Sequence, residues 1–279
     1  MASIITLLEN FEQPEAQRLT GLTFENAVQR IEEFCPGFDY NDTKMYPRIY
    51  RGSKRPEEAY VCQTDVTRRT SANAVNSCYN IIMSANTDYP DRLESLIGTT
   101  DLSLTKEYTG MFGTSYVVIP RAGTVVGVCP KEDVFYCFPV LQKELGIGHL
   151  GEFADAIDFA CNMANKYARG LKTLKDWKLA MAAIDRVLKQ EKLYMPPQSD
   201  IDRFGWANKL MYRNALCDAI KAYGKGGYQY LLDRFDPATA GFKTFRYGVD
   251  VAPKMGDKEV WLKGECLLIK EESFRSYHR

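Results

Sequence analysis

Asp257-Lys258-Glu259-Val260-Trp261-Leu262 and, shortly after it, Cys266-Leu267-Leu268-Ile269 form the last apolar stretch of this chain and decide its fold. Lys263-Gly264 between them is typical of a turn, so the sequence predicts a final pair of strands. Glu259 opens the first of these strands, and Trp261 is expected in the core. A carboxylate that begins a strand is most often a solvated group, so its meaning depends on which other segments lie beside it.

Two strand-like segments far upstream end in groups that could act together with Glu259. Arg48-Ile49-Tyr50-Arg51-Gly52 ends in an arginine and a glycine, and Ser95-Leu96-Ile97-Gly98-Thr99-Thr100-Asp101 ends in two hydroxyls and a carboxylate. A guanidinium offers a fixed fork of donors to a phosphate or ribose oxygen. A glycine lets backbone groups approach a ligand closely. The hydroxyls read equally well as a strand end followed by a helix cap.

The rest of the chain predicts an α+β fold with a long helical segment in its second half. Thr23 is a plausible N-cap for an amphipathic helix over residues 23–34. Apolar residues recur at helical spacing between about 140 and 235, and the glycine-rich and aromatic-rich stretch 241–248 is expected to be a loop. Further predicted elements are a helix over 68–83 and strands over 46–51, 94–99, 115–120 and 124–129.

Composition argues against several classes of function, although a local basic patch would be compatible with it. The 36 basic and 36 acidic side chains leave no net charge, which disfavours a general nucleic-acid or membrane-surface binder. The eight cysteines are scattered without a C-x-x-C motif and only two histidines exist, so we expect reduced thiols and no metal site. The N-terminus lacks a basic region before its short apolar run, and a cytoplasmic protein is expected. Delivery into a host cytosol by a phage or a specialised secretion machine would leave no such mark.

The three segments together suit cleavage of a glycosidic bond to a cationic leaving group. Nicotinamide in NAD is such a group, and its departure leaves positive charge on the ribose that a carboxylate can stabilise. Glu259 is the candidate for this role, and Glu265, which follows the Lys263-Gly264 turn, is its lower-ranked rival. Arg51 could bind NAD, while Thr99 and Thr100 could orient the carboxylate.

With these motifs the chain resembles the mono-ADP-ribosyltransferase family of the arginine-serine-glutamate class, found in bacterial toxins, secreted effectors and phage-encoded enzymes. The resemblance covers about residues 46–130 and 236–270, and it lies in the strand ending Tyr50-Arg51-Gly52, the strand running into Thr99-Thr100-Asp101 and the final carboxylate strand. The family's hydroxyl motif is normally Ser-Thr-Ser, from which Thr99-Thr100-Asp101 departs. Asp257, a shorter side chain, stands where the family often has Glu or Gln. This difference leaves the type of acceptor open, although it favours a cationic acceptor such as arginine.

The resemblance implies a split β-sandwich of two small packed sheets around an NAD cleft, interrupted by a large helical insertion. The expected parts are residues 1–134 as the N-terminal helix and first half of the core, 135–235 as the insertion, and 236–279 as the second half with the catalytic-glutamate strand. NAD would be a substrate, and a macromolecule, expected to be a host protein, would accept ADP-ribose. The implied residues are Glu259, Arg51 and Thr99 for catalysis, Arg51, Gly52, Arg69, Ser71, Thr99 and Thr100 for binding NAD, and Asp257, Phe245 and Tyr247 for facing the acceptor.

Two alternatives remain open at this point. With water as the acceptor the same chemistry would make the chain an NAD glycohydrolase. From a different class, a non-catalytic phage or effector protein could use the same fold and bind a partner through its helical part. For Arg69 and Ser71, an ordinary helix start with surface charge is as good an interpretation as phosphate binding. The enzymatic interpretation requires that residues 51 and 259 flank one crevice; coordinates that place their side chains on opposite faces would overturn it and leave a generic mixed domain.

Overall fold

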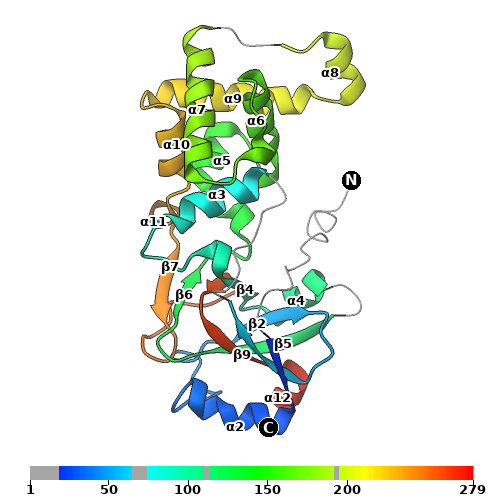
Figure 1. Ribbon diagram of the computed structural model, residues 1–279, viewed down its shortest axis with the longest axis vertical. Coiled ribbons are helices and arrows are strands. Elements are labelled where there is room, and N and C mark those ends of the chain that lie inside the picture. The colour runs from blue at the N-terminus through cyan, green and yellow to red at the C-terminus, as the bar shows by residue number, and fades with distance from the viewer. Residues whose placement is uncertain (1–18, 65–73, 110–112, 192–194, 279) are drawn as a thin grey trace. The chain divides into compact units, whose positions relative to one another are not determined.

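The fold is described from a computed structural model that covers residues 19–64, 74–109, 113–191 and 195–278 (Figure 1). The described residues divide into two compact units. The first contains residues 19–64, 87–133 without 110–112, and 242–278, and it holds the sheet. The second contains residues 134–241 without 192–194, together with helix α3 (Ala74–Ser84), and it is helical. The α+β class predicted from the sequence is therefore confirmed.

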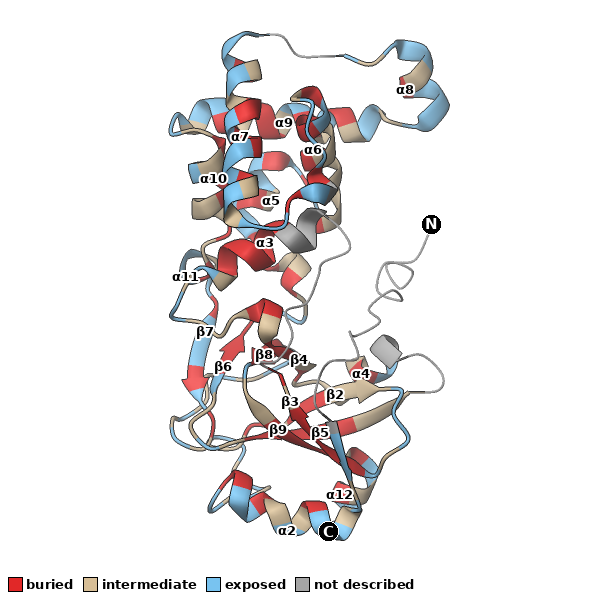
Figure 2. Ribbon diagram, viewed as in Figure 1, coloured by how far each residue is buried: buried red, intermediate tan, exposed pale blue. Residues whose placement is uncertain are grey.

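A nine-stranded antiparallel sheet organises the first unit, in the spatial order β1-β3-β9-β5-β2-β4-β8-β6-β7. Both strands predicted at the end of the chain are present, as β8 and β9, but they do not pair with each other: β8 lies between β4 and β6, and β9 lies between β3 and β5. Each of these two strands lies inside the sheet, and Figure 2 shows their buried residues. The strands are β1 (Leu19–Leu22), β2 (Ile49–Ser53), β3 (Ala59–Gln63), β4 (Leu96–Thr99), β5 (Thr114–Pro120), β6 (Val125–Val128), β7 (Lys243–Arg246), β8 (Glu259–Leu262) and β9 (Glu265–Lys270).

The shortest pairing between neighbouring strands of the sheet is that of β2 with β4. These strands share a single paired position, Tyr50 with Thr99, whereas each other neighbouring pair shares between three and five. Beyond that position the Arg51 side chain connects the two strands, because its Nη1 donates a hydrogen bond to the carbonyl oxygen of Ile97 on β4. The sequence analysis expected two separate sheets. The structure has one sheet in which two halves, β1-β3-β9-β5-β2 and β4-β8-β6-β7, are joined at this point.

Short helices cover the sheet unit, and the first of them forms as its sequence predicts. Thr23 is the N-cap of α2 (Phe24–Phe34), and its hydroxyl accepts a hydrogen bond from the Asn26 amide at 3.3 Å. The helix buries Ala27, Ile31 and Phe34 at helical spacing. The remaining helices of this unit are η1 (Arg92–Glu94), α4 (Leu102–Thr109) and α12 (Glu271–Tyr277).

The helical unit has its own core, in which three phenylalanines meet. Phe235 makes edge-on ring contacts with Phe138 at 4.9 Å and with Phe153 at 5.3 Å, and all three are buried. Besides α3, its helices are η3 (Val134–Tyr136), α5 (Pro139–Leu145), α6 (Leu150–Met163), η4 (Ala168–Gly170), α7 (Leu174–Lys189), α8 (Gln198–Phe204), α9 (Ala207–Tyr223), α10 (Gly227–Arg234) and α11 (Pro237–Ala240). The sequence analysis assigned α3 to the sheet unit, but α3 packs against α6 and α7.

Three strands escaped the sequence analysis, and β7 shows why. Residues 241–248 were expected to be a loop, but Lys243–Arg246 pairs with β6 at the edge of the sheet. Only Phe245 of this strand is buried, so alternation over four residues is too short to be distinguished from an irregular segment. β1 and β3 were also not expected. The eight cysteines are all free and buried, as their scattered positions suggested.

Histidine protonation is expected to weaken the docking of α12. His278 stacks on Tyr40 at 4.8 Å, and the Arg48 guanidinium lies over the same tyrosine ring. Burial lowers the pKa of His278 below its ordinary 6.5, against a smaller raising effect of Asp39. The unfolded chain therefore binds this proton more readily, and stability should fall as pH decreases through the histidine range.

Urea unfolding between about pH 8 and about pH 5 tests this expectation, since histidine charge changes in that interval. His278→Phe keeps an aromatic ring but cannot titrate, so its stability should fall less steeply with acid than that of the wild type. Equal slopes for the two proteins would contradict the expectation.

Candidate functional site

Tyr50, Thr99 and Glu259 lie in one row across three neighbouring strands of the sheet unit. Thr99 is paired with Tyr50 of β2 on one side and with Glu259 of β8 on the other. Directly opposed residues of antiparallel strands project from the same face. The predicted neighbourhood of Thr99 and Glu259 is therefore present, and Tyr50, which the sequence analysis did not single out, joins it.

Glu259 is a buried carboxylate held from several directions. Its residue is 7% exposed, and its carboxylate Oε1 accepts from Nη2 of Arg92, itself 8% exposed. Its backbone N–H donates to the Lys131 carbonyl at 3.2 Å, and its carbonyl accepts from the Cys129 amide at 2.9 Å. Burying a carboxylate is costly unless it is paired and hydrogen-bonded. Glu259 is therefore not the solvated carboxylate that is usual at the start of a strand, because its side chain is buried and hydrogen-bonded.

Thr100 holds the segment that leads into Glu259. Its hydroxyl donates to the Gly256 carbonyl and accepts from the Lys258 amide at 3.0 Å, and its own amide donates to the Lys258 carbonyl at 2.9 Å. Asp257 lies within this turn and is exposed. Thr100 therefore acts on Glu259 through the backbone before it, and it leaves Asp257 accessible to solvent.

Replacing Thr100 by valine removes the hydroxyl and keeps the shape. Losing two hydrogen bonds should lower the free energy of unfolding by about 1–2 kcal/mol. Urea unfolding measures this loss, and Thr244→Val at the exposed position of β7 is the matched control, expected within about 0.5 kcal/mol of the wild type. Equal stabilities for the two variants would mean that Thr100 does not hold the turn.

Thr99 and Asp101 connect β4 to α4, as predicted by the alternative interpretation of this segment as a strand end followed by a helix cap. The Thr99 hydroxyl accepts from the Asp101 amide at 3.1 Å. The Asp101 carboxylate accepts from the Ser103 amide at 2.8 Å, in the first turn of α4. These residues cap the helix, and the same contacts fix Thr99 at its place beside Glu259.

Arg51 does not share the face of Glu259, which corrects the expectation that the two flank one crevice. It follows Tyr50 directly, and successive strand residues project from opposite faces. Its neighbours are Tyr60, Cys62 and Cys266 on the other face of the sheet, and burial lowers its pKa. With Nη1 bonded to the Ile97 carbonyl, Arg51 joins β2 to β4. Gly52, in contrast, is two residues after Tyr50 and therefore belongs to the same face of β2, where it pairs with Ser115 of β5.

Phe245 and Tyr247 are not available to an acceptor, which is a second correction. They are 4% and 2% exposed and belong to the core of the sheet unit. Burial raises the pKa of Tyr247 well above its ordinary value. The exposed side chains of the segment that follows, up to β8, are Val249, Val251, Lys254 and Asp257. Arg69 and Ser71, predicted to bind the NAD phosphates, lie outside the described residues.

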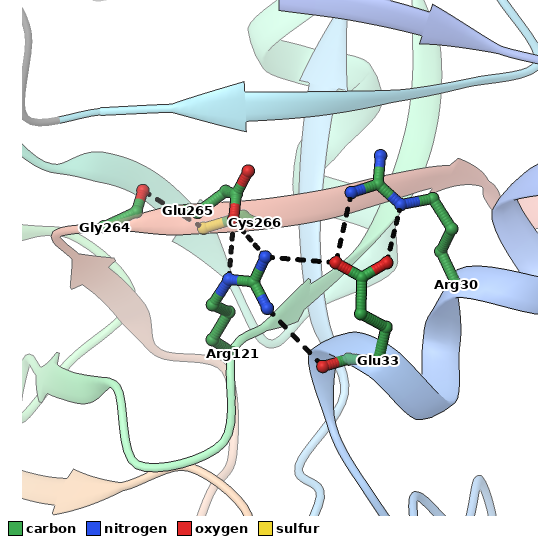
Figure 3. A network of polar contacts seen from close by, with 6 residues as sticks. All are labelled: Arg30, Glu33, Arg121, Gly264, Glu265 and Cys266. Carbon is green, nitrogen blue, oxygen red and sulfur yellow. Dashed lines mark hydrogen bonds and ion pairs between the residues drawn. The ribbon is translucent and has the colours of Figure 1, made fainter.

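Glu265, the rival carboxylate, serves the packing of α2 against the sheet (Figure 3). Arg121 donates through Nε to Glu265 Oε2 at 2.5 Å and reaches Glu33 Oε1 at 3.4 Å. Arg30 holds the other oxygen of Glu33, and the Arg121 guanidinium lies 4.3 Å over the ring of Phe34. The ranking of Glu259 above Glu265 is consistent with this structural use.

Arg92 and the residues around it were missed by the sequence analysis. Arg92-Leu93-Glu94 reads as a polar turn, and no sequence pattern marks a buried ion pair that joins residues so far apart in the chain. Trp261, expected in the core, is fully buried, and its indole N–H donates to the Pro90 carbonyl at 2.8 Å.

No family model, curated protein or solved structure matches the chain. Among the described residues no helix is both long and apolar enough to cross a membrane. The same residues contain no cluster of three or more histidine, cysteine, aspartate or glutamate side chains that could hold a metal ion.

Proposed function

We propose that this chain is a mono-ADP-ribosyltransferase that transfers ADP-ribose from NAD to a macromolecular acceptor, a host protein being the expected one. The observation that carries the proposal is the position of Glu259. It begins β8 directly opposite Thr99 at the end of β4, and exposed Asp257 lies two residues before it. A carboxylate, a hydroxyl and an exposed acidic side chain therefore lie close together where β4 ends and β8 begins.

In the proposed reaction the bond between ribose C1′ and the nicotinamide nitrogen breaks, and its electron pair leaves with nicotinamide. The Glu259 carboxylate stabilises the positive charge that develops on the ribose. An acceptor nucleophile then forms a bond to C1′ and releases its proton. Asp257 faces the acceptor, and Gly52, which has no side chain, would let its backbone approach the nicotinamide amide.

The split-sandwich fold belongs to this proposal. The sheet narrows to one pair between Tyr50 and Thr99, and a sheet joined so weakly can bend into two halves with a cleft at the joint. In the revised assignment Arg51 has a structural role at that joint. The diphosphate of NAD then needs other donors, and Arg69 and Ser71 remain the predicted ones.

A second candidate is a non-catalytic interaction protein on the same fold. Two observations favour it: Glu259 is already paired with Arg92 in a buried position, and Arg51 projects from the opposite face. In this interpretation the ion pair only joins η1 to β8.

Incubation with NAD labelled in its adenylate part separates these candidates. A transferase releases nicotinamide and attaches label to a macromolecule of a host extract, which mass spectrometry then identifies. Nicotinamide release without attached label would replace the proposal by NAD hydrolysis. If the protein releases no nicotinamide and millimolar NAD does not raise its melting temperature, the non-catalytic candidate is favoured, because a ligand of the native state stabilises it by mass action.

A further inference from the structure

The segment 89–95 braces the strand that carries Glu259. It runs through η1 into β4, and Asp91 caps η1 by accepting from the Leu93 amide at 2.9 Å. The Ser95 hydroxyl donates back to the Asp91 carbonyl at 2.7 Å. These local bonds make the turn a fixed support for Arg92, which points from it towards β8.

Contacts along the whole length of β8 tie this segment to the strand. At the start of β8, Arg92 pairs with Glu259. In the middle, Trp261 donates to the Pro90 carbonyl and stacks on Tyr89 with an interplanar angle of 21°. Just after the strand, Lys263 Nζ reaches Glu94 Oε2 at 2.6 Å.

The two ion pairs of this brace differ in burial. The side chains of Arg92 and Glu259 are each 9% exposed, whereas Lys263 and Glu94 are 39% and 26% exposed. A buried ion pair adds less stability than its charges suggest, because both ions lose their hydration. Apolar residues of similar volume often stabilise a fold equally well. What a buried guanidinium does supply is a fixed direction for the carboxylate that it binds.

We propose that Arg92 is a positioning residue for Glu259. The inference rests on the proposed function, since it gives Arg92 the task of holding the carboxylate where the ribosyl cation forms. Nη2 of Arg92 binds Oε1 of Glu259, so rotation of the carboxylate would break this bond. Electrostatic stabilisation of a transition state is effective when the charged group is already oriented. Arg92 acts through Glu259 and needs no contact with NAD.

Initial rates of nicotinamide release at varied NAD concentrations test this role in three variants. Arg92→Met should lower kcat about 100-fold, the loss typical of a displaced catalytic group. KM for NAD should stay within about threefold of the wild type, because only a transition-state interaction is lost. Arg92→Lys keeps the charge without the guanidinium geometry, and about a tenfold loss of kcat is expected. Lys270→Met, which removes an ion pair with Glu58 outside this brace, is the control, and it should keep kcat within about threefold.

The double variant Arg92→Met/Glu259→Gln separates positioning from a general structural role. If Arg92 acts through Glu259, the double variant should be no slower than Glu259→Gln alone. Multiplied losses would overturn the inference, and so would an unchanged kcat in folded Arg92→Met. Should Arg92→Met fail to fold, Arg92→Lys decides, and an unchanged kcat in that variant overturns the role.

The failure of the inference is distinguishable from that of the proposed function. A wild-type protein that releases no nicotinamide would overturn the proposed function, and the positioning role with it. An active wild type with fully active Arg92 variants would overturn the positioning role alone.

Discussion

Glu259→Gln is expected to lower the rate of nicotinamide release about 1000-fold, because the uncharged amide cannot stabilise the ribosyl cation. Glutamine keeps the size of the side chain and an oxygen that can accept from Arg92. The fold should therefore persist, and binding of NAD should be retained. Initial rates of nicotinamide release from the purified protein, with circular dichroism as a check on folding, measure the effect.

Glu265→Gln is the matched control for this variant. Glu265 is also an ion-paired glutamate that begins a strand, β9, and its partner is Arg121. The control should keep the rate within about threefold of the wild type. A rate of Glu259→Gln equal to that of this control would exclude Glu259 as the catalytic group.

Gly127→Ala is expected to destabilise the sheet unit by about 3 kcal/mol, near the upper end for overpacking a core. Gly127 of β6 is opposite Trp261 of β8, and a Cβ atom at this position would lie 2.3 Å from the indole Cε2. The indole cannot move away easily, because it is fully buried and donates to the Pro90 carbonyl at 2.8 Å. The free energy of unfolding from urea titrations measures the loss.

Gly21→Ala is the control for this glycine. Gly21 also lies in a strand of the sheet, β1, but a Cβ atom there would meet only Glu57 Cγ at 3.5 Å, an ordinary contact. Its stability should stay within about 0.5 kcal/mol of the wild type. Equal stabilities of the two variants would mean that the Trp261 ring is not held against Gly127. Because Trp261 belongs to the brace around Glu259, Gly127→Ala should also reduce nicotinamide release.

The elements with strong local signals were predictable from the sequence. Thr23 and the apolar spacing behind it predicted α2 to within one residue, and the β-branched run at 115–120 predicted β5. The Lys263-Gly264 turn and the apolar runs on either side of it predicted the strands β8 and β9, but not the neighbours with which each of them pairs. In each case the information lies within about a dozen neighbouring residues, where capping, periodicity and turn chemistry act.

The site was predictable only in part, because it depends on strand register. Alternation alone shows that Tyr50 and Arg51 project from opposite faces. Which of them shares a face with Glu259 is decided by the single pair of Tyr50 with Thr99, and that pairing joins segments about fifty residues apart. The sequence motif predicted that Arg51 lies near Glu259, whereas the strand register places Tyr50 on the face of Glu259. Thr99 and Glu259 were predicted to act together from the motif alone, and the register of β4 with β8 sets them opposite each other.

Buried polar groups were the hardest to predict. A carboxylate and a guanidinium in the sequence look solvated, and Arg92 and Glu259 become a buried pair only when η1 meets β8. Phe245 and Tyr247 show the opposite error, because aromatic residues in a short segment before a catalytic motif were interpreted as a contact surface. Both belong to the core of the sheet unit, and Phe245 is itself a residue of the edge strand β7.

A crystal structure with a non-cleavable NAD analogue tests the central claim most directly. The account predicts that the nicotinamide-side ribose lies within about 4 Å of the Glu259 carboxylate, the range of strong charge interaction, on the face of the sheet that carries Tyr50 and Thr99. An analogue bound on the face of Arg51, Tyr60 and Cys266, or on the helical unit, would contradict it.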